Sequence, residues 1–407
     1  MKKPEILAPA GNIEKLKTAI YYGADAVYLS GKSYGLRRGA DNFNLKMMEE
    51  GAAYAHKNNV KVYVTVNIFF HNQDLTGLSG YLKTLENLGI DGIIVSDPGV
   101  INIAKESIPS MPLHLSTQAN TTNYESVLFW QTCGVRRINL ARELSFKEIV
   151  EIREKSHIEL EVFVHGAMCI SYAGRCLISN FIVGRDSNRG ECCQPCRWRY
   201  ALVEESRKGE YFPIMEDESY TYFFNSKDLC LIDYIPDLID SGIDSLKIEG
   251  RMKSAYYVGG VVRIYREAID SYCRKMNTSR FKEKWKEELL KVSNRGYTNG
   301  FFHERPGPEA QSYKEPPYQR EYDFVGITRG KKEEGTGTKV EVRKKIERGD
   351  VLEILYKGSD VKVIETNGMR DLDGNLVESA NPNSTVIIEE AIDVIPGQLI
   401  RRKGWRE

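Results

Sequence analysis

The sequence predicts an α/β fold: a TIM-like (β/α)8 barrel with a cysteine-rich insert, followed by a small C-terminal β-barrel domain. In roughly the first 275 residues, short apolar runs alternate eight times with amphipathic segments, as buried parallel strands alternate with helices. From about residue 321 the pattern changes to short alternating strands separated by turn signals. An open doubly wound sheet is the alternative for the first region, because a sequence alone does not show that a sheet closes.

The predicted barrel strands are short runs rich in Val, Ile and Leu. They are expected at Glu5–Ala8, Ala26–Leu29, Val62–Val66, Gly92–Val95, Leu113–Ser116, Arg137–Leu140, Leu160–Val164 and Ser245–Ile248. The segments between them place apolar residues at helical spacing, beginning with a helix that Asn12 caps and that ends at Tyr22. The later helices are expected at Leu45–Lys57, Leu75–Leu88, Val100–Ser107, Tyr124–Cys133, Phe146–Lys155, Leu229–Ser241 and Tyr256–Tyr272.

These elements divide the chain into three parts. The barrel is expected at residues 1–275 and includes the cysteine-rich loop at 166–230. A charged helix over Phe281–Val292 and a Pro/Gly-rich stretch form a connector at 276–320. Six short strands within 321–407 then predict the small β-barrel domain.

The composition excludes several classes of protein. The formal net charge is zero, so any contact with nucleic acid must come from local runs such as Arg343–Lys345 and Arg401–Lys403, which a solvated face explains equally well. There is no apolar stretch of membrane-spanning length and no signal-peptide core at the start, so we expect a cytoplasmic protein without membrane contact. In a reducing compartment, clustered cysteines are more often metal ligands or redox groups than disulfides.

Polar residues stand at the ends of several predicted barrel strands. They are Asn67, Asp97, Gln118, His165, Glu249 and Arg251. Because catalytic groups of a TIM barrel lie at the C-terminal ends of its strands, these side chains are expected to converge on one mouth. Asn and Asp also follow strands simply as helix caps, which is the competing explanation for Asn67 and Asp97. His165 and Glu249 are the candidates for moving protons.

Cysteines are concentrated in one stretch, since five of the eight fall between Glu161 and Tyr200. They are Cys169, Cys176, Cys192, Cys193 and Cys196. Four thiolates bind either structural zinc or an iron–sulfur cluster. Zinc sites favour pairs of cysteines two residues apart, whereas these spacings are wide and irregular, so a 4Fe-4S cluster is favoured and zinc is the alternative. Which of Cys192, Cys193 and the more distant Cys230 is a ligand stays open on the spacing alone.

Several motifs in this chain resemble one known family. They are EVFVHGAMC at Glu161–Cys169, GRCLIS at Gly174–Ser179, LAPAGN at Leu7–Asn12, GADAVYLS at Gly23–Ser30, NSKDLC at Asn225–Cys230, KIEGRMKS at Lys247–Ser254 and NRGYTNGFF at Asn294–Phe302. Together they resemble the collagenase-like peptidase family of unassigned catalytic type (family U, number thirty-two), in the right order over some 300 residues. The terminal β-domain is also typical of that family.

The resemblance implies a chemistry other than the proteolysis in the family's name. Better-understood members hydroxylate C5 of a tRNA uridine, C5 of a 23S rRNA cytidine, or a quinone precursor, and they hold iron–sulfur clusters with cysteines of this region. In the tRNA branch, whose overall length this chain shares, the cysteine spacing implies Cys169, Cys176, Cys192 and Cys196 as the ligands. Cys193 and Cys230 depart from that pattern.

The resemblance also implies two substrates: a tRNA with an unpaired uridine in its anticodon loop, and prephenate or a similar small carboxylate as the hydroxyl source. Arginine forks suit carboxylates, and Arg251 and Arg175 are the candidates. Gln118 and Asn67 complete the predicted substrate-binding set. Because the quinone-hydroxylating members occur as pairs, a partner protein of the same family is a further expectation.

Proteolysis is the alternative function, as is hydroxylation of an rRNA cytidine or a quinone precursor. A peptidase needs an activated nucleophile or a metal-held water. The sequence contains neither a Gly-x-Ser-x-Gly elbow nor a His-Glu-x-x-His helix. A pair of Cys169 and His165 is conceivable, but a cysteine that ligates a cluster is not a nucleophile.

Overall fold

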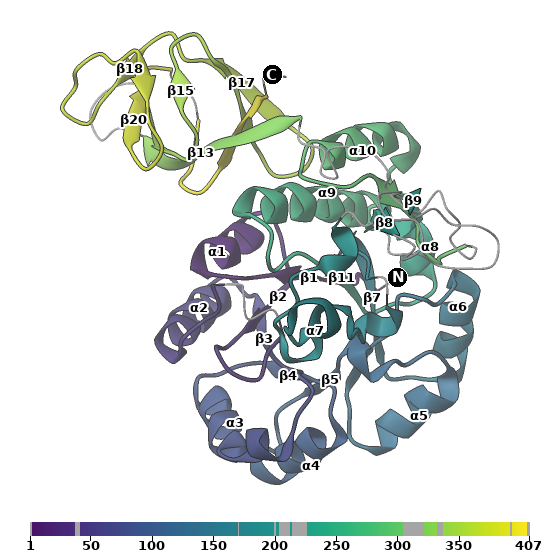
Figure 1. The fold of residues 1–407 in the computed structure, drawn as a ribbon. Coiled ribbons are helices and arrows are strands. Elements are labelled where there is room, and N and C mark those ends of the chain that lie inside the picture. Colours follow the sequence, from purple (N-terminus) through teal and green to yellow (C-terminus); the bar gives the residue numbers. More distant parts are fainter. Residues whose placement is uncertain are drawn as a thin grey trace.

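The first part of the protein is a closed barrel of parallel strands surrounded by helices (Figure 1). The computed structural model describes residues 2–36, 41–169, 171–198, 201–202, 212–213, 226–303, 321–331, 337–390 and 393–404. The barrel strands are β1 (Glu5–Pro9), β2 (Ala26–Ser30), β3 (Lys61–Val66), β4 (Gly92–Val95), β5 (Leu113–Leu115), β6 (Arg137–Asn139), β7 (Glu159–Ala167) and β11 (Ser245–Ile248). Since β11 pairs in parallel with both β1 and β7, the sheet closes, and the predicted barrel is confirmed over the open alternative.

The helices of the barrel follow the predicted segments closely. They are α1 (Ile13–Tyr21), α2 (Leu45–Lys57), α3 (Leu78–Asn87), α4 (Pro98–Ser107), α5 (Tyr124–Thr132), α6 (Phe146–Lys155), α8 (Ile235–Asp240) and α9 (Ala255–Cys273). The side chain of Asn12 accepts a hydrogen bond from the backbone N–H of Lys15 at 2.9 Å and so caps α1, as predicted. The polar strand-end residue Asp97 likewise caps α4, which is the competing explanation raised for it.

Two predicted helices begin later than expected. The helix predicted at Leu75–Leu88 is interrupted by Gly77, whose backbone is left-handed (φ 81°), so a short turn at Asn72–Leu75 precedes α3. In the segment Leu229–Ser241, where one helix was predicted, the first residues instead belong to the strand β10 (Asp228–Cys230), and α8 follows. β10 pairs antiparallel with the end of β7. Extended pairing satisfies the backbone groups at the end of β7, and this interaction prevails over the helical spacing of the sequence.

The C-terminal part is an antiparallel sheet that forms a half-barrel, as the predicted β-domain requires. Its strands are β13 (Tyr322–Lys331), β14 (Thr338–Val342), β16 (Val351–Leu355), β17 (Val361–Glu365), β18 (Met369–Arg370), β20 (Thr385–Ile388) and β21 (Leu399–Lys403). A separate pair, β15 (Ile346–Glu347) and β19 (Ser379–Ala380), lies beside it. The sheet has its own apolar core, which includes Val340, Ile354 and Ile400.

The β-domain packs on α9 (Figure 1). Gly259 of α9 permits a close approach, because a Cβ at that position would lie 2.5 Å from the Leu399 side chain. The Tyr22 hydroxyl bridges the two parts: it donates to the Leu355 carbonyl at 3.0 Å and accepts from the Leu399 N–H at 3.0 Å. The β-domain therefore shares an apolar and hydrogen-bonded interface with the barrel.

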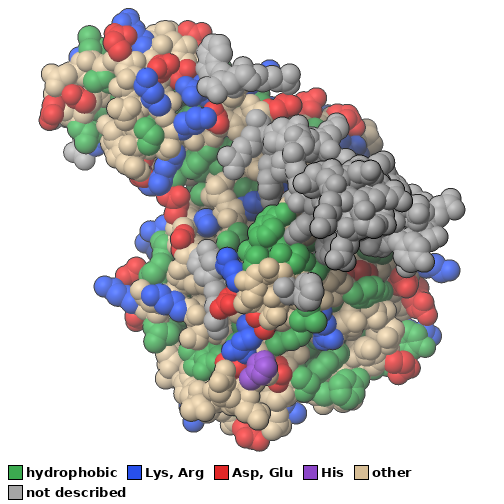
Figure 2. All heavy atoms as spheres, viewed as in Figure 1, with side chains coloured by type: hydrophobic (Ala, Val, Ile, Leu, Met, Phe, Trp, Pro, Cys, Tyr) green, Lys and Arg blue, Asp and Glu red, His purple; other side chains and the backbone are tan. Residues whose placement is uncertain are grey.

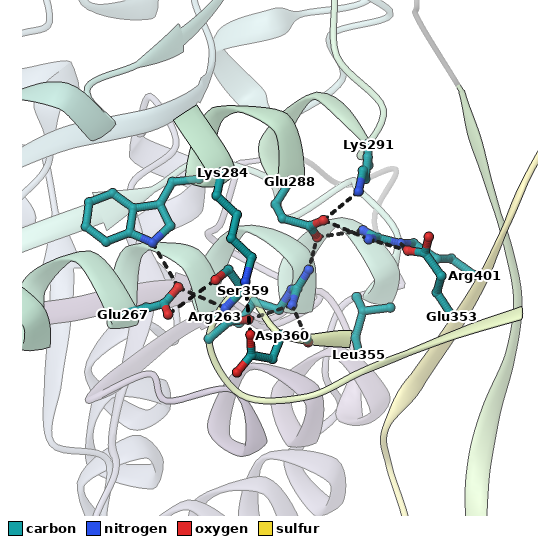
Figure 3. Close-up of polar contacts among 12 residues, drawn as sticks. Arg263, Glu267, Lys284, Glu288, Lys291, Glu353, Leu355, Ser359, Asp360 and Arg401 are labelled. Carbon is teal, nitrogen blue, oxygen red and sulfur yellow. Dashed lines mark hydrogen bonds and ion pairs between the residues drawn. The ribbon is translucent and has the colours of Figure 1, made fainter. Parts of the chain in front are cut away.

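A buried ionic network reinforces this interface (Figure 3). Glu288 of α10 (Lys282–Leu290) pairs with Arg263 of α9 and, at 2.9 Å, with Arg401 of β21. Arg401 also pairs with Glu353 at 2.5 Å. The positive charge of Arg263 and Arg401 outweighs the opposing effect of burial and lowers the pKa of Glu288 to about 2. The carboxylate is therefore ionised wherever the protein is folded at ordinary pH.

Candidate active site at the barrel mouth

A cavity of about 150 Å³ opens at the C-terminal ends of the barrel strands. The predicted site residues that line it are Asn67, Gln118, Glu249, Arg251, Cys169, Cys176, Cys192 and Cys196. Two predicted residues, His165 and Arg175, are not part of its lining. The barrel therefore brings together most of the side chains that the sequence singles out, on the face where TIM-barrel sites are found.

The segment after β7 folds across this mouth, and its short helix α7 (Ile178–Val183) crosses the barrel in the view of Figure 1. Gly166 allows the chain to turn there, because a Cβ would lie 2.5 Å from the Glu249 carbonyl and the backbone is left-handed (φ 110°). Arg189 anchors the segment to the barrel by a bidentate ion pair with Asp74, at 2.7 and 2.9 Å. Hydrogen bonds from Arg189 and from the backbone N–H of His71 lower the pKa of the Asp74 carboxyl to about 2, against the opposing effect of burial.

Of the six cysteines considered as ligands, four line the cavity, and Cys193 and Cys230 do not. The Cys176 sulfur accepts the Ile178 N–H at 3.4 Å, and the Cys192 sulfur accepts the Gln194 N–H at 3.3 Å. Cys193, by contrast, contacts the buried hydroxyl of Ser179 through both its sulfur and its backbone N–H, each at 3.3 Å. Of the vicinal pair, therefore, Cys192 lines the cavity and Cys193 does not.

Cys230 ends β10, where it lies opposite His165 of β7 in the antiparallel pairing, and its sulfur contacts the Tyr265 hydroxyl at 3.8 Å. Burial raises the pKa of its thiol to about 11. The four cysteines of the lining provide thiol donors of the chemical type that an iron–sulfur cluster or zinc takes. In the described residues, no three Cys, His, Asp or Glu side chains are close enough together to hold a metal ion.

Asn67 and Gln118 form a connected pair of amides in the cavity. The Asn67 Nδ2 donates to Gln118 Oε1 at 3.1 Å and to Ser116 Oγ at 3.3 Å. The Asn67 Oδ1 accepts the backbone N–H of Leu36 at 3.5 Å. Asn67 does not cap a helix, so the cap explanation does not apply to it. The pair is buried, because Asn67 is 8% exposed and Gln118 is 5% exposed.

The two predicted arginines occupy different places. Arg251 is 3% exposed and donates to Thr65 Oγ1 at 3.2 Å inside the barrel mouth. Arg175 lies at the exposed rim, where its Nε donates to the Gln118 carbonyl at 2.8 Å and its guanidinium lies 5.9 Å from the centre of the Phe69 ring. Arg175 thus holds the backbone of Gln118 in place, whereas Arg251 contributes to the cavity itself.

His165 faces the helical layer instead of the mouth. Its ring lies between 5.2 and 6.0 Å from the rings of Tyr257, Tyr265 and Tyr297. The expectation that it joins the mouth is not met, because the pairing of β7 with β11 shifts by one residue: Phe163 pairs with Lys247, but His165 pairs with Ile248. Such a bulge reverses the face on which the following side chain lies. Burial lowers the pKa of His165 to about 3, so its imidazole is neutral.

The cavity also has a charged floor, which the sequence did not predict. Lys247 lines it and donates to Glu161 Oε1 at 2.8 Å, and Glu161 also lies 3.6 Å from Arg137. Burial opposes ionisation of Glu161, but Lys247 and Arg137 outweigh it and keep its pKa below the usual range. Arg142 is a further cation of the lining, 4.5 Å from the Phe163 ring that Lys247 also approaches, at 5.4 Å. The sequence did contain a sign of this floor, because Glu161 and Lys247 are charged residues inside otherwise apolar strands.

The basic runs proposed for RNA contact are paired with acidic residues. Arg343 pairs with Glu14, Lys344 with Asp323 at 2.6 Å, and Lys345 with Glu347 at 2.6 Å. Figure 2 shows Lys and Arg side chains interspersed with Asp and Glu over the displayed face. The run Arg343–Lys345 therefore matches the solvated-face explanation. In the second run, Arg401 belongs to the buried ionic network and Arg402 pairs with Asp350. Among the described residues, no helix is both long and apolar enough to cross a bilayer.

Comparison with known proteins agrees with this architecture. Residues 11–312 match the model of peptidase family U32, and residues 320–401 match that of the peptidase family U32 C-terminal domain. The chain is 44% identical to "tRNA hydroxylation protein P1" of Bacillus subtilis, over 98% of this chain and 95% of the relative. It is 38% identical to "tRNA hydroxylation protein P" of Escherichia coli, over 87% of this chain and 86% of the relative.

A more distant relative of different size is also similar. "23S rRNA 5-hydroxycytidine C2501 synthase" of Escherichia coli is 32% identical over 87% of this chain but only 52% of the relative. The family model covers the barrel strands from β2 onwards and the cysteine segment that contributes to the cavity. With relatives that align along nearly its whole length, the chain belongs to peptidase family U32.

Proposed function

We propose that this protein is a tRNA-modifying enzyme of the cytoplasm that hydroxylates C5 of an anticodon-loop uridine, with prephenate as the hydroxyl source and an iron–sulfur cluster as cofactor. The observation that carries the proposal is a cavity at the barrel mouth whose lining includes four cysteines together with amide and cationic side chains. The near end-to-end similarity to a tRNA hydroxylation protein supports tRNA as the substrate. Support for an rRNA substrate is weaker, because this chain covers only about half of the relative that is named for rRNA.

The cavity suits a flat base taken from an unpaired loop. Tyr28, Ile94 and Phe163 provide apolar and aromatic lining against which a pyrimidine ring stacks. A base in a loop is already unpaired, so little energy is spent in moving it into the site. The neighbouring amides of Asn67 and Gln118 offer hydrogen bonds to its polar edge.

The same cavity suits an anionic donor. Lys247 and Arg142 both line it and are both held against Phe163, and Arg251 is buried beside them in the lining. Prephenate carries two carboxylates, and buried cations bind carboxylates strongly in a site that excludes water. We therefore assign the carboxylates to this group of cations, with Glu249 as the candidate that moves a proton.

Cys169, Cys176, Cys192 and Cys196 are the residues that would hold the cluster. When bound, a 4Fe-4S cluster would supply one-electron transfer at this site. Because replacement of the C5–H bond by C5–OH oxidises the base by two electrons, the proposed reaction also requires an external electron acceptor, to which the cluster would pass these electrons one at a time. Zinc remains the competing occupant of the same four thiols. A second protein of the same family is a further proposed partner.

The peptidase alternative receives no support from the geometry. Cys169 lines the cavity, whereas His165 packs among tyrosines outside it, and the hydrogen bonds of the described residues include none between the two. A thiol without a neighbouring base is not activated as a nucleophile.

Nucleoside mass spectrometry of tRNA tests the proposal. Deletion of the gene, together with any paralogue, should remove 5-hydroxyuridine-derived nucleosides, and the wild-type gene should restore them. The Arg251→Met gene should fail to restore them, whereas Arg136→Met, a change at an exposed arginine of the barrel, should succeed. An unchanged nucleoside profile in the deletion strain would refute the proposed function.

A further inference from the structure

The amide of Gln118 is held in one orientation by a directed series of hydrogen bonds. The series starts at the backbone N–H of Leu36, which has no acceptor capacity and therefore requires an oxygen from Asn67. That contact leaves the Asn67 NH2 group to donate to Gln118 Oε1 at 3.1 Å. The remaining NH2 group of Gln118 is then the polar end available to a ligand in the cavity.

The backbone of Gln118 is fixed as well. Arg175 donates to its carbonyl at 2.8 Å, and its own N–H approaches Ser116 Oγ at 3.4 Å. The side chain is 5% exposed and lies in the cavity lining. A donor that is held in this way does not need to reorganise when a ligand arrives, which makes its hydrogen bond selective.

A fixed donor distinguishes the two pyrimidines. Uracil carries a carbonyl oxygen at C4, which accepts a hydrogen bond, whereas cytosine carries an amino group there, which donates. Facing the Gln118 NH2 group, uracil gains a bond, and cytosine leaves two buried donors against each other. C4 is bonded to C5, so the contacted oxygen lies two bonds from the carbon that the proposed reaction modifies.

We propose that Gln118 selects uracil over cytosine by donating to O4 of the base, and that Asn67 is the positioning residue that sets the direction of the Gln118 amide. The inference rests on the proposed function in that it takes a pyrimidine of RNA as the ligand. It adds the residues that read the base, and it explains how one cavity rejects the other pyrimidine.

Binding of short oligonucleotides tests this selection without any turnover. Labelled oligouridylate and oligocytidylate of equal length are titrated with the purified full-length protein, and fluorescence anisotropy gives the ratio of the two dissociation constants. The wild-type protein should prefer oligouridylate by about tenfold, the worth of one well-placed hydrogen bond. Gln118→Ala should bring the ratio close to one.

Two substitutions should reverse the preference. Gln118→Glu places an acceptor where the donor was, so it should favour oligocytidylate. Asn67→Asp removes the donor to Gln118 Oε1, so the Gln118 amide should rotate and present its oxygen to the base, again favouring oligocytidylate. A reversal of preference is not expected from a merely structural role of Asn67. Gln131→Glu, the same change at an exposed position of α5, should keep the wild-type ratio.

Far-UV circular dichroism checks that each variant is folded. If Asn67→Asp does not fold, the Gln118 variants alone decide the test. Equal affinity of the wild-type protein for both oligonucleotides overturns the proposal, as does a wild-type ratio in Gln118→Ala and Gln118→Glu. The tRNA profile of the deletion strain is a separate measurement, so a failure of the hydroxylation function is distinguished from a failure of base selection.

Discussion

Lys247 of β11 donates to Glu161 of β7 at 2.8 Å, and both side chains are nearly inaccessible to solvent, at 6% and 2% exposure. Glu161 in turn lies 3.6 Å from Arg137, which pairs at 2.5 Å with Glu5. The interior of this barrel is thus crossed by alternating charges, whereas layers of branched apolar side chains are usual in such barrels. Each charge is compensated by a neighbour, so removal of one partner leaves the neighbouring charge buried in the barrel interior without an opposite charge.

Glu161→Gln should destabilise the protein by about 3 kcal/mol, because it leaves Lys247 and Arg137 buried without their shared carboxylate. Urea unfolding at neutral pH measures this loss. Glu159→Gln is the matched control, since Glu159 is on the same strand and bonds the same arginine at 2.8 Å but is 31% exposed. That change should cost under about 1 kcal/mol. Equal losses in the two variants would contradict a special role for the buried pair.

Lys247→Met should weaken the binding of the anionic donor while leaving the affinity for tRNA unchanged. The variant removes a buried cation from the cavity floor, and a charge-assisted hydrogen bond of this kind corresponds to a loss of about tenfold or more. Isothermal titration with prephenate measures the effect, and Lys247→Arg should retain part of the affinity. If Lys247→Met binds prephenate as tightly as the wild-type protein, the cation group does not hold the carboxylates.

The contact between the β-domain and the barrel should depend on pH through Glu288. Its pKa lies at about 2 in the folded protein against 4.5 ordinarily, so the stabilisation is fully present above pH 4.5 and is lost as the pH falls towards 2. The shift corresponds to about 3 kcal/mol. Glu288→Gln should therefore lose about that amount at pH 7 and less at pH 3, by urea unfolding. Glu287→Gln, at the exposed neighbouring residue, should show no such difference.

The barrel strands could be predicted because strands that are buried on both faces are rich in apolar, β-branched residues along their whole length, as Val62–Val66 is. Once the strand ends were located, the polar residues just after them, such as Asn67 and Glu249, could be predicted to lie at the barrel mouth. The position of His165 could not be found, because a one-residue shift between two strands leaves no mark on a sequence. The pairing of Glu161 with Lys247 joins residues 86 apart, so only the closed barrel reveals it.

Cysteine variants should separate the predicted ligands from the other cysteines. Anaerobically purified protein should be brown, and Cys169→Ala should lose both its iron and its visible absorbance, because Cys169 lines the cavity. Cys193→Ala and Cys230→Ala should keep both, since their sulfurs contact Ser179 and Tyr265 instead. A colourless wild-type protein with stoichiometric zinc would exclude the cluster, and loss of iron in Cys193→Ala would exclude the proposed ligand set.

His165 should destabilise the protein at acidic pH without taking part in catalysis. Burial lowers its pKa to about 3, against an ordinary value of 6.5, so the unfolded chain binds a proton that the folded protein does not. Stability is therefore lost as the pH falls below 6.5, by about 2 kcal/mol at pH 5. His165→Phe fits the aromatic surroundings of Tyr257 and Tyr265 and should narrow the difference in unfolding free energy between pH 8 and pH 5 by about that amount. His157→Phe, at an exposed position, should leave the difference unchanged, and a large loss of hydroxylation in a folded His165→Phe protein would return His165 to the list of catalytic candidates.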